Sequence, residues 1–124
     1  MGRSILVVDD NDFNRDLVKD ILEDEDVTVY EAPDGDSAVD FMKSADGEHV
    51  DVILMDLRMP VMDGLEAARL IRQAGRMKVV IIAMTADLFE SDKKNIYDSG
   101  MNGIITKPIE VTTLADNIAK VAGW

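Results

Sequence analysis

The sequence predicts a doubly wound α/β fold, in which five helices cover both faces of a mainly parallel sheet of five strands. Two observations lead to this prediction. Short apolar runs, too short for helices and bounded by turn residues, recur along the chain, which is the pattern of strands buried inside a sheet. Segments whose apolar residues recur at helical spacing lie between these runs, so that strands and helices alternate.

The first strand is predicted at residues 4–8, an apolar run that ends in a pair of acidic residues. A helix should follow, because Asn11 or Asp12 can cap its first turn. The apolar positions of this helix fall on one face: Phe13, Leu17, Val18, Ile21 and Leu22. Apolar and polar residues then alternate over residues 27–31, which indicates a half-exposed strand at an edge of the sheet.

The central strand is predicted at residues 52–55, where an apolar run ends in a lone carboxylate, Asp56. A Pro-Asp-Gly turn opens the preceding helix, which ends at residues 46–47. The apolar positions of that helix are Ala38, Val39, Phe41, Met42 and Ala45. The next helix should begin after Asp63 as its N-cap and end at Gly75, which suits the left-handed conformation that terminates helices.

The last third of the chain repeats the pattern. A buried strand is predicted at residues 79–84 and ends at Thr85, and a short strand at residues 103–106 leads to Lys107. The helix expected between them, over residues 88–99, carries the apolar residues Leu88, Phe89, Ile96 and Tyr97. A final amphipathic helix is expected on Val111, Leu114, Ala115, Ile118 and Val121.

Composition limits the possible partners of the protein. The formal net charge is -12, so a nucleic acid or an anionic membrane surface would be repelled, whereas a metal cation or a basic partner would be attracted. The absence of cysteine excludes disulfides, thiolate metal sites and thiol nucleophiles. Nothing at the N-terminus resembles a signal peptide or a spanning segment. We therefore expect a single cytoplasmic domain over residues 1–124, with no room for a second module such as an effector or output domain.

Five polar residues follow the predicted strands: Asp9, Asp10, Asp56, Thr85 and Lys107. The carboxyl ends of parallel strands lie at one edge of the sheet, where such folds bind ligands, so these side chains should meet there. Taken singly, each has an ordinary structural explanation, such as a capped loop or a surface lysine. Their convergence is more specific than any one of them.

The predicted cluster has a definite chemistry. Three neighbouring carboxylates repel one another, and a bound divalent cation relieves that repulsion. Ligands that are all oxygen suit Mg²⁺. Beside the ion, the carboxylate of Asp56 can attack a phosphoryl group and form an aspartyl-phosphate. Lys107 can supply a positive charge and Thr85 a hydrogen bond to the phosphoryl oxygens.

Four ordered motifs make the sequence resemble the receiver domain of two-component response regulators over essentially its whole length. They are residues 7–11, residues 55–60 with Asp63 and Gly64, residues 83–86, and Lys107 with Pro108. The resemblance implies the flavodoxin-like strand order 2-1-3-4-5. It also implies a signalling switch rather than an enzyme, acting as a monomer or weak dimer.

The resemblance assigns roles to the acidic residues. Asp56 is the residue that would accept a phosphoryl group from the phosphohistidine of a histidine kinase or a histidine phosphotransfer protein. Asp10 would bind Mg²⁺ directly and Asp9 directly or through water. Asp56 and the backbone carbonyl of Arg58 would complete the protein ligands.

The resemblance also implies a response to phosphorylation. Thr85 and Lys107 would bond the phosphoryl oxygens, and the surface of the last strand and the last two helices would change shape and bind a downstream protein target. Receivers usually carry Tyr or Phe three residues before the lysine, where this chain has Ile104. Arg58 and Asp87 would flank the phosphoryl group and could pair across the mouth of the site.

One alternative fits the sequence as well as this interpretation, and three fit it less well. A receiver that forms part of a hybrid histidine kinase fits the motifs equally well. A haloacid-dehalogenase-like phosphatase also forms an aspartyl-phosphate, but its D-x-D-x-T/V motif would place Thr or Val where this chain has Asn14. A flavodoxin-type protein needs a phosphate loop without acids after the first strand. An EF-hand loop starting at Asp10 fails because Arg15 and Ile21 occupy its glycine and glutamate positions.

Overall fold

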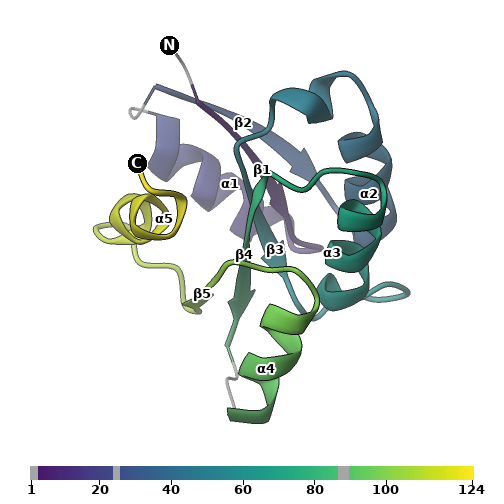
Figure 1. Ribbon diagram of the computed structural model, residues 1–124. Helices are drawn as coiled ribbons and strands as arrows, with labels where there is room; N and C mark the ends of the chain where they lie inside the picture. Colours follow the sequence, from purple (N-terminus) through teal and green to yellow (C-terminus); the bar gives the residue numbers. More distant parts are fainter. Residues whose placement is uncertain (1–2, 24–25, 87–89) are drawn as a thin grey trace.

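The computed structural model describes residues 3–23, 26–86 and 90–124, and within these ranges the chain adopts the predicted α/β fold (Figure 1). Five parallel strands form one sheet in the order β2-β1-β3-β4-β5, which confirms the implied strand order. The strands are β1 (Arg3–Val8), β2 (Val27–Ala32), β3 (Val52–Asp56), β4 (Val80–Thr85) and β5 (Gly103–Thr106). The helices are α1 (Asp12–Leu22), α2 (Gly35–Lys43), α3 (Gly64–Gln73), α4 (Glu90–Asp98) and α5 (Leu114–Ala122), with a 3-10 helix η2 (Asp46–His49).

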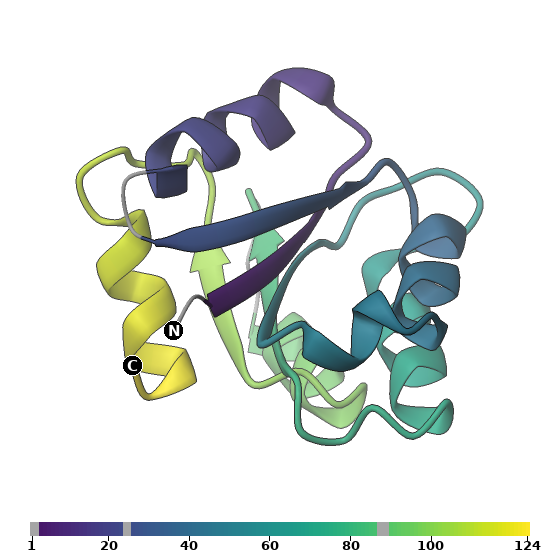
Figure 2. The same cartoon turned by 90° about the horizontal axis from the view of Figure 1, so that it is seen from above.

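The helices form two layers, one on each face of the sheet. Helices α1 and α5 lie on one face, and α2, α3 and α4 lie on the other (Figures 1 and 2). The longest described helix, α1, has 11 residues, and within the described ranges no helix is long and apolar enough to cross a bilayer.

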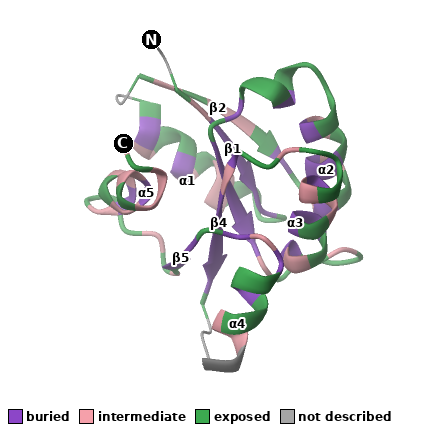
Figure 3. Cartoon of the chain, viewed as in Figure 1, coloured by how far each residue is buried: buried purple, intermediate pink, exposed green. Residues whose placement is uncertain are grey.

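The central strand β3 joins the two halves of the hydrophobic core. Successive residues of a strand point to opposite faces of a sheet. Val52 and Leu54 accordingly pack in the core beneath α1 and α5, while Ile53 and Met55 pack in the core beneath α2 and α3. All five residues of β3 are buried, and Figure 3 shows buried residues concentrated in the sheet.

Side-chain caps fix where three helices begin. Asn11, Asp34 and Asp63 each accept a hydrogen bond from the backbone N–H three residues further on, at 3.0, 2.7 and 2.9 Å. The cap of α1 is therefore Asn11 rather than Asp12, and the predicted cap Asp63 is confirmed. Gly75 follows the end of α3 with a φ of +98°, as predicted.

Three residues predicted on apolar helix faces, Phe13, Val111 and Ala45, are exposed instead. Phe13 has an exposed fraction of 72% because, at about 100° per residue, it lies nearly opposite the buried Leu22 on α1. Val111 is 63% exposed because α5 begins only at Leu114, so that Val111 falls in the preceding turn. Ala45 likewise follows the end of α2. Apolar spacing alone therefore shows neither which part of an apolar stripe faces the core nor where a helix begins and ends.

The region around α4 differs from the prediction in one further respect. Ile96 is fully buried, but its neighbour Tyr97, which points about 100° further round the helix, is 51% exposed. The predicted apolar positions Leu88 and Phe89 lie outside the described residues.

Candidate functional site

The register of the sheet brings the ends of the central strands to the same level. Val8 of β1 pairs with Met55 of β3, and Thr85 of β4 pairs with Thr106 of β5. The polar residues that end or follow these strands therefore share one edge of the sheet, as predicted.

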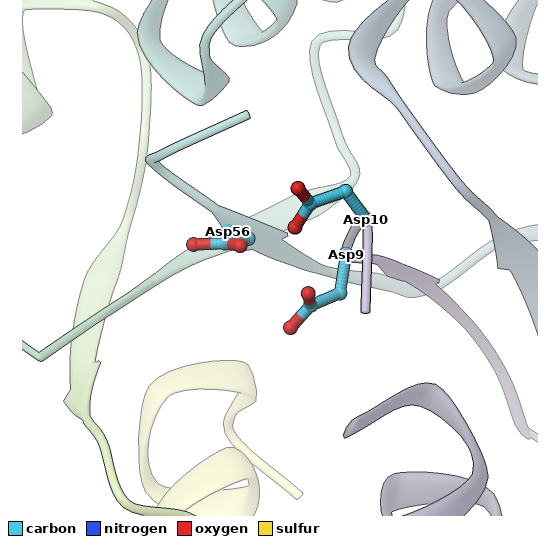
Figure 4. Close-up of side chains that lie close together, drawn as sticks. All are labelled: Asp9, Asp10 and Asp56. Atoms are coloured by element: carbon cyan, nitrogen blue, oxygen red, sulfur yellow. The ribbon is translucent and has the colours of Figure 1, made fainter. Parts of the chain in front are cut away.

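Asp9, Asp10 and Asp56 lie together at this edge (Figure 4). One carboxylate oxygen from each residue lies within 4.8 Å of the other two. Asp9 and Asp56 are buried, with exposed fractions of 3% and 4%, whereas Asp10 is exposed. The cluster therefore has a buried floor formed by two acids and an opening to solvent beside the third.

Two donors hold the carboxylate of Asp56. The backbone N–H of Arg58 donates to its Oδ1 at 3.2 Å, and Nζ of Lys107 lies 3.4 Å from the same oxygen. Burial, and then the negative charge of Asp9, nevertheless raise the pKa of Asp56 above its usual value. The two donors oppose this rise but do not cancel it, so another cation at this edge would stabilise the ionised form.

Lys107 bridges the two buried acids. Its Nζ lies 3.3 Å from Oδ2 of Asp9 as well as 3.4 Å from Oδ1 of Asp56, and its side chain is only 19% exposed. Its backbone N–H donates to the carbonyl of Thr85 at 2.8 Å, which ties the end of β5 to the end of β4. The lysine predicted from the sequence therefore lies at the acidic cluster.

The remaining predicted residues lie close by in the sheet. Thr85 is buried at the end of β4, one residue beyond Met84, which pairs with Asp56. Arg58 lies two residues after Asp56 and points its backbone N–H toward that carboxylate, while its side chain is exposed. Asp87, its predicted partner, lies outside the described residues.

Two residues that the sequence reasoning did not assign to the site also contact it. The side-chain amide of Asn14 donates to Oδ2 of Asp9 at 3.2 Å, and Nη1 of Arg15 donates to the backbone carbonyl of Asp9 at 2.6 Å. The sequence signal for them is their place on the first turn of a capped helix just after the acids, from which a long side chain reaches back to the turn.

The ligand atoms that the cluster offers suit a hard divalent cation. All three side chains offer carboxylate oxygens, and one of the three carboxylates, on Asp10, is open to solvent. Mg²⁺ prefers oxygen ligands and keeps several waters, which an open site permits. The geometry thus suits an ion bound by a few carboxylates and by the oxygens of a further ligand.

A groove lies apart from the acids, between α4, β5 and α5. It has a volume of about 530 Å³, and Tyr97, Ile104 and Lys120 are among the residues that line it. Ile104 is half-buried and packs against the core, in the position where the resemblance led us to expect an aromatic residue.

Comparison with known proteins identifies the family. The family model of the response regulator receiver domain matches residues 5–119. The chemotaxis protein CheY of Halobacterium salinarum is 35% identical over 121 residues, which cover 98% of each chain. The autoinducer sensor kinase/phosphatase CqsS of Vibrio cholerae is 38% identical over 98% of this chain.

Solved structures agree with these relatives. The receiver domain of sensor histidine kinase PA1611 from Pseudomonas aeruginosa, which has a magnesium ion coordinated in its active-site cleft, is 35% identical, with a TM-score of 0.84 and full coverage of both chains. The receiver domain of the Saccharomyces cerevisiae response regulator Ssk1, solved with the histidine phosphotransfer protein Ypd1, is 28% identical with a TM-score of 0.87, over 98% of this chain and 90% of that one.

The chain therefore belongs to the response regulator receiver domain family. Receiver domains act as phosphoryl-accepting switches in two-component signalling, and they bind Mg²⁺ at their acidic site. The chain spans only a small part of the kinases that it matches: 17% of CqsS, and 7% of hybrid signal transduction histidine kinase L of Dictyostelium discoideum.

Proposed function

We propose that Asp56 is the phosphoacceptor of this receiver domain and that its phosphorylation depends on Mg²⁺. The observation that carries the proposal is the placement of Asp56, buried at the end of β3 between Lys107 and the acids Asp9 and Asp10. Buried carboxylates with a raised pKa and a charged partner at contact distance cluster at reactive sites.

The residues have separate tasks in the transfer. An oxygen of Asp56 attacks the phosphorus of a phosphohistidine; the new O–P bond forms as the P–N bond breaks, and its electron pair leaves on the imidazole nitrogen. Lys107 offers its charge to the phosphoryl oxygens, and Thr85 offers a hydroxyl from the neighbouring strand. Asp9, Asp10, Asp56 and the carbonyl of Arg58 would hold Mg²⁺, which when bound neutralises the charge that develops on those oxygens.

The readout would lie on the face that contains the groove. We propose that phosphorylation draws Thr85 and Lys107 toward the phosphoryl group and so alters the surface of α4, β5 and α5. Since Lys107 directly follows β5, a movement of its backbone reaches that strand first. A downstream protein would bind the altered surface.

The setting of the domain is also a proposal. Residues 1–124 would act as one cytoplasmic receiver domain that works alone as a monomer or weak dimer, a suggestion that the full-length match with CheY supports. The donor would be a histidine kinase or a histidine phosphotransfer protein, as in the Ypd1 co-crystal. The alternative, a receiver that belongs to a hybrid histidine kinase, is supported by the matches with CqsS and the Dictyostelium kinases.

Phosphorylation of purified protein tests the acceptor. The chain is incubated with Mg²⁺ and phosphoramidate, a small donor with a P–N bond, and the intact mass is measured. We expect one phosphoryl group on the wild type and on Asp40→Asn, whose carboxylate is exposed on α2, and none on Asp56→Asn. The label should be lost in hydroxylamine, as an acyl phosphate is. Label retained by Asp56→Asn would contradict the proposal.

A further inference from the structure

Asp9 is the most firmly held of the three acids. Its Oδ1 accepts the backbone N–H of Asn11 at 2.9 Å, and its Oδ2 accepts from the amide of Asn14 at 3.2 Å and from Lys107 at 3.3 Å. Its backbone carbonyl accepts from Arg15 at 2.6 Å. Both the side chain and the main chain of this residue therefore accept hydrogen bonds from the start of α1, and the side chain accepts a further one from Lys107.

Arg15 connects three segments through one planar group. Nη1 bonds the carbonyl of Asp9, Nη2 pairs with Asp12, and Nε lies 3.5 Å from Oε1 of Glu31 near the end of β2. The Arg15 side chain is only 13% exposed, although the side chain of Asp12 is 86% exposed, so solvent screens the bond to the Asp9 carbonyl less than the pair with Asp12. A guanidinium presents its N–H donors in fixed directions. This single side chain therefore fixes the position of the β1–α1 turn relative to the start of α1 and the end of β2.

Asp10 contrasts with Asp9. It follows in the same turn, but its side chain is exposed, and no residue within the described ranges donates a hydrogen bond to it. Of the two acids that follow β1, one is thus preorganised and the other is open. A metal-ligating side chain that is already held in place loses less conformational freedom when the ion binds. Groups that donate hydrogen bonds to such a side chain typically increase the affinity of the site for the metal.

We propose that Asn14 and Arg15 are positioning residues for Mg²⁺ binding, which hold Asp9 toward Asp10 and Asp56 against the repulsion among the three carboxylates. Asn14 acts on the carboxylate itself, and Arg15 acts on the main chain that carries it. This inference rests on the function proposed above, since it assigns both residues a role at the same acidic site.

Calorimetric titration of Mg²⁺ into the metal-free protein tests the inference. The test variants are Asn14→Ala and Arg15→Lys, the latter of which keeps the charge but loses the fork of donors. The matched controls are Asn95→Ala and Arg69→Lys, which change exposed residues on α4 and α3. We expect the Kd for Mg²⁺ to rise roughly tenfold in Arg15→Lys, a common effect of removing an outer partner of a metal ligand. A smaller rise is expected in Asn14→Ala, and none in the controls.

Two further readouts separate positioning from a merely structural role. Unfolding by urea in the presence of a chelator reports metal-free stability, and the rate of Asp56 labelling by phosphoramidate is measured against Mg²⁺ concentration. A positioning role requires that the labelling defect of Arg15→Lys disappears at saturating Mg²⁺. A defect that persists at saturation, or an unchanged Kd with lowered metal-free stability, would overturn the inference.

The failure of the inference is distinguishable from the failure of the proposed function. If the wild type binds Mg²⁺ and is labelled on Asp56 while both variants keep its Kd, only the inference fails. If the wild type binds no Mg²⁺, the inference and the metal dependence of the proposed function fail together. Labelling of a residue other than Asp56 would overturn the proposed acceptor, whatever the Kd values are.

Discussion

The ammonium group of Lys107 lies 3.4 Å from Oδ1 of Asp56, and only 19% of the lysine side chain is exposed. One positive charge thus faces two buried negative charges, because Asp9 lies 3.3 Å from the same ammonium group. The raised pKa of Asp56 indicates that this partial neutralisation leaves its carboxylate destabilised. The negative charge that Lys107 does not neutralise makes this edge of the sheet suitable for a divalent ion.

The first prediction concerns Asp56 and pH. Its pKa is raised in the folded protein, so its ionised form lowers the free energy of unfolding at neutral pH, and this penalty disappears as the pH falls toward the ordinary value of 3.8. In Mg²⁺-free buffer, Asp56→Asn should therefore be more stable than the wild type at pH 7, by about 1 kcal/mol, the size of an ordinary single-residue effect. The two stabilities should converge as the pH falls to about 4.

Urea unfolding at a series of pH values checks this prediction. Asp40→Asn, which removes an exposed carboxylate from α2, serves as the control and should follow the wild type closely. An Asp56→Asn protein that is less stable than the wild type at pH 7 would show that the contacts with Lys107 and the Arg58 N–H outweigh the cost of burial.

The second prediction concerns Mg²⁺ and stability. An ion that binds only the folded state raises the free energy of unfolding by RT ln(1 + [Mg²⁺]/Kd), which is about 1.4 kcal/mol when the concentration is about ten times Kd. The melting temperature of the wild type should therefore rise at millimolar Mg²⁺, and that of Asp10→Asn should rise much less. Thermal melts with Mg²⁺ or chelator decide the matter. An equal rise in the melting temperature of the two proteins would show that Asp10 does not bind the ion.

The third prediction separates phosphorylation from switching. Lys107→Ala should still be labelled to some degree with Mg²⁺ present, because Asp56 and the other acids remain. It should fail to switch fully, because the charge of the lysine is needed more to hold the product state than to start the attack, and a hydrogen bond to a charged group contributes about 1.5–3 kcal/mol. Phosphorylation-induced NMR shifts of groove residues such as Ile104 and Tyr97 measure the switch. Full shifts in phosphorylated Lys107→Ala would contradict this role.

Much of this site follows from the sequence because parallel strands place their ends together. The apolar runs before Asp9, Asp56 and Thr85 were enough to predict that these residues share an edge, and Lys107 followed from the last strand. No knowledge of side-chain rotamers was needed, since the register of the sheet sets the positions to within a residue.

Contacts that depend on side-chain direction did not follow from the sequence. The reach of Arg15 back to the Asp9 carbonyl depends on where α1 begins, and the sequence allowed two caps, Asn11 and Asp12. Which part of the apolar stripe of α1 faces the sheet depends on packing as well, since Val18 and Leu22 are buried whereas Phe13, nearly opposite Leu22, is exposed. Both are properties of tertiary packing, which a helical period does not contain.

The fourth prediction concerns Gly64, the first residue of α3. A Cβ at this position would lie 2.5 Å from the backbone oxygen of Asp56 and 2.9 Å from Cγ of Met55, so Gly64→Ala must displace the end of β3. We expect a loss of about 1–3 kcal/mol in stability, the usual cost of overpacking, together with slower labelling of Asp56.

A second glycine provides the matched control. Gly75 has a φ of +98°, and no atom lies within 4 Å of the position that a Cβ would take. Gly75→Ala therefore introduces only backbone strain, of about 1–2 kcal/mol. Its labelling rate should equal that of the wild type under conditions in which both are folded. If the two variants label at the same rate, the contact between Gly64 and Asp56 does not position the acceptor.

The last prediction concerns the lifetime of the phosphorylated state. Arg58 lies two residues after Asp56, its backbone N–H faces that carboxylate, and its side chain is exposed. Asp87, two residues after Thr85, carries the opposite charge. If the two side chains form an ion pair in contact with solvent, that pair changes stability by at most about 1 kcal/mol. Its effect on hydrolysis can exceed its effect on folding, because the exclusion or misorientation of one attacking water acts on the transition state.

We therefore expect Arg58→Ala and Asp87→Ala each to change the rate of aspartyl-phosphate loss several-fold, which corresponds to about 1 kcal/mol in the barrier. If the two side chains act as a pair, the double variant should be non-additive. Decay of the purified phosphoprotein at fixed Mg²⁺, followed by intact mass, measures all four rates, with Arg69→Ala as a control for the loss of an exposed arginine. If the phosphorylated single variants lose the phosphoryl group at the wild-type rate, neither side chain controls the access of the attacking water. Strictly additive changes would mean that each residue acts on the water independently, without a contact between them.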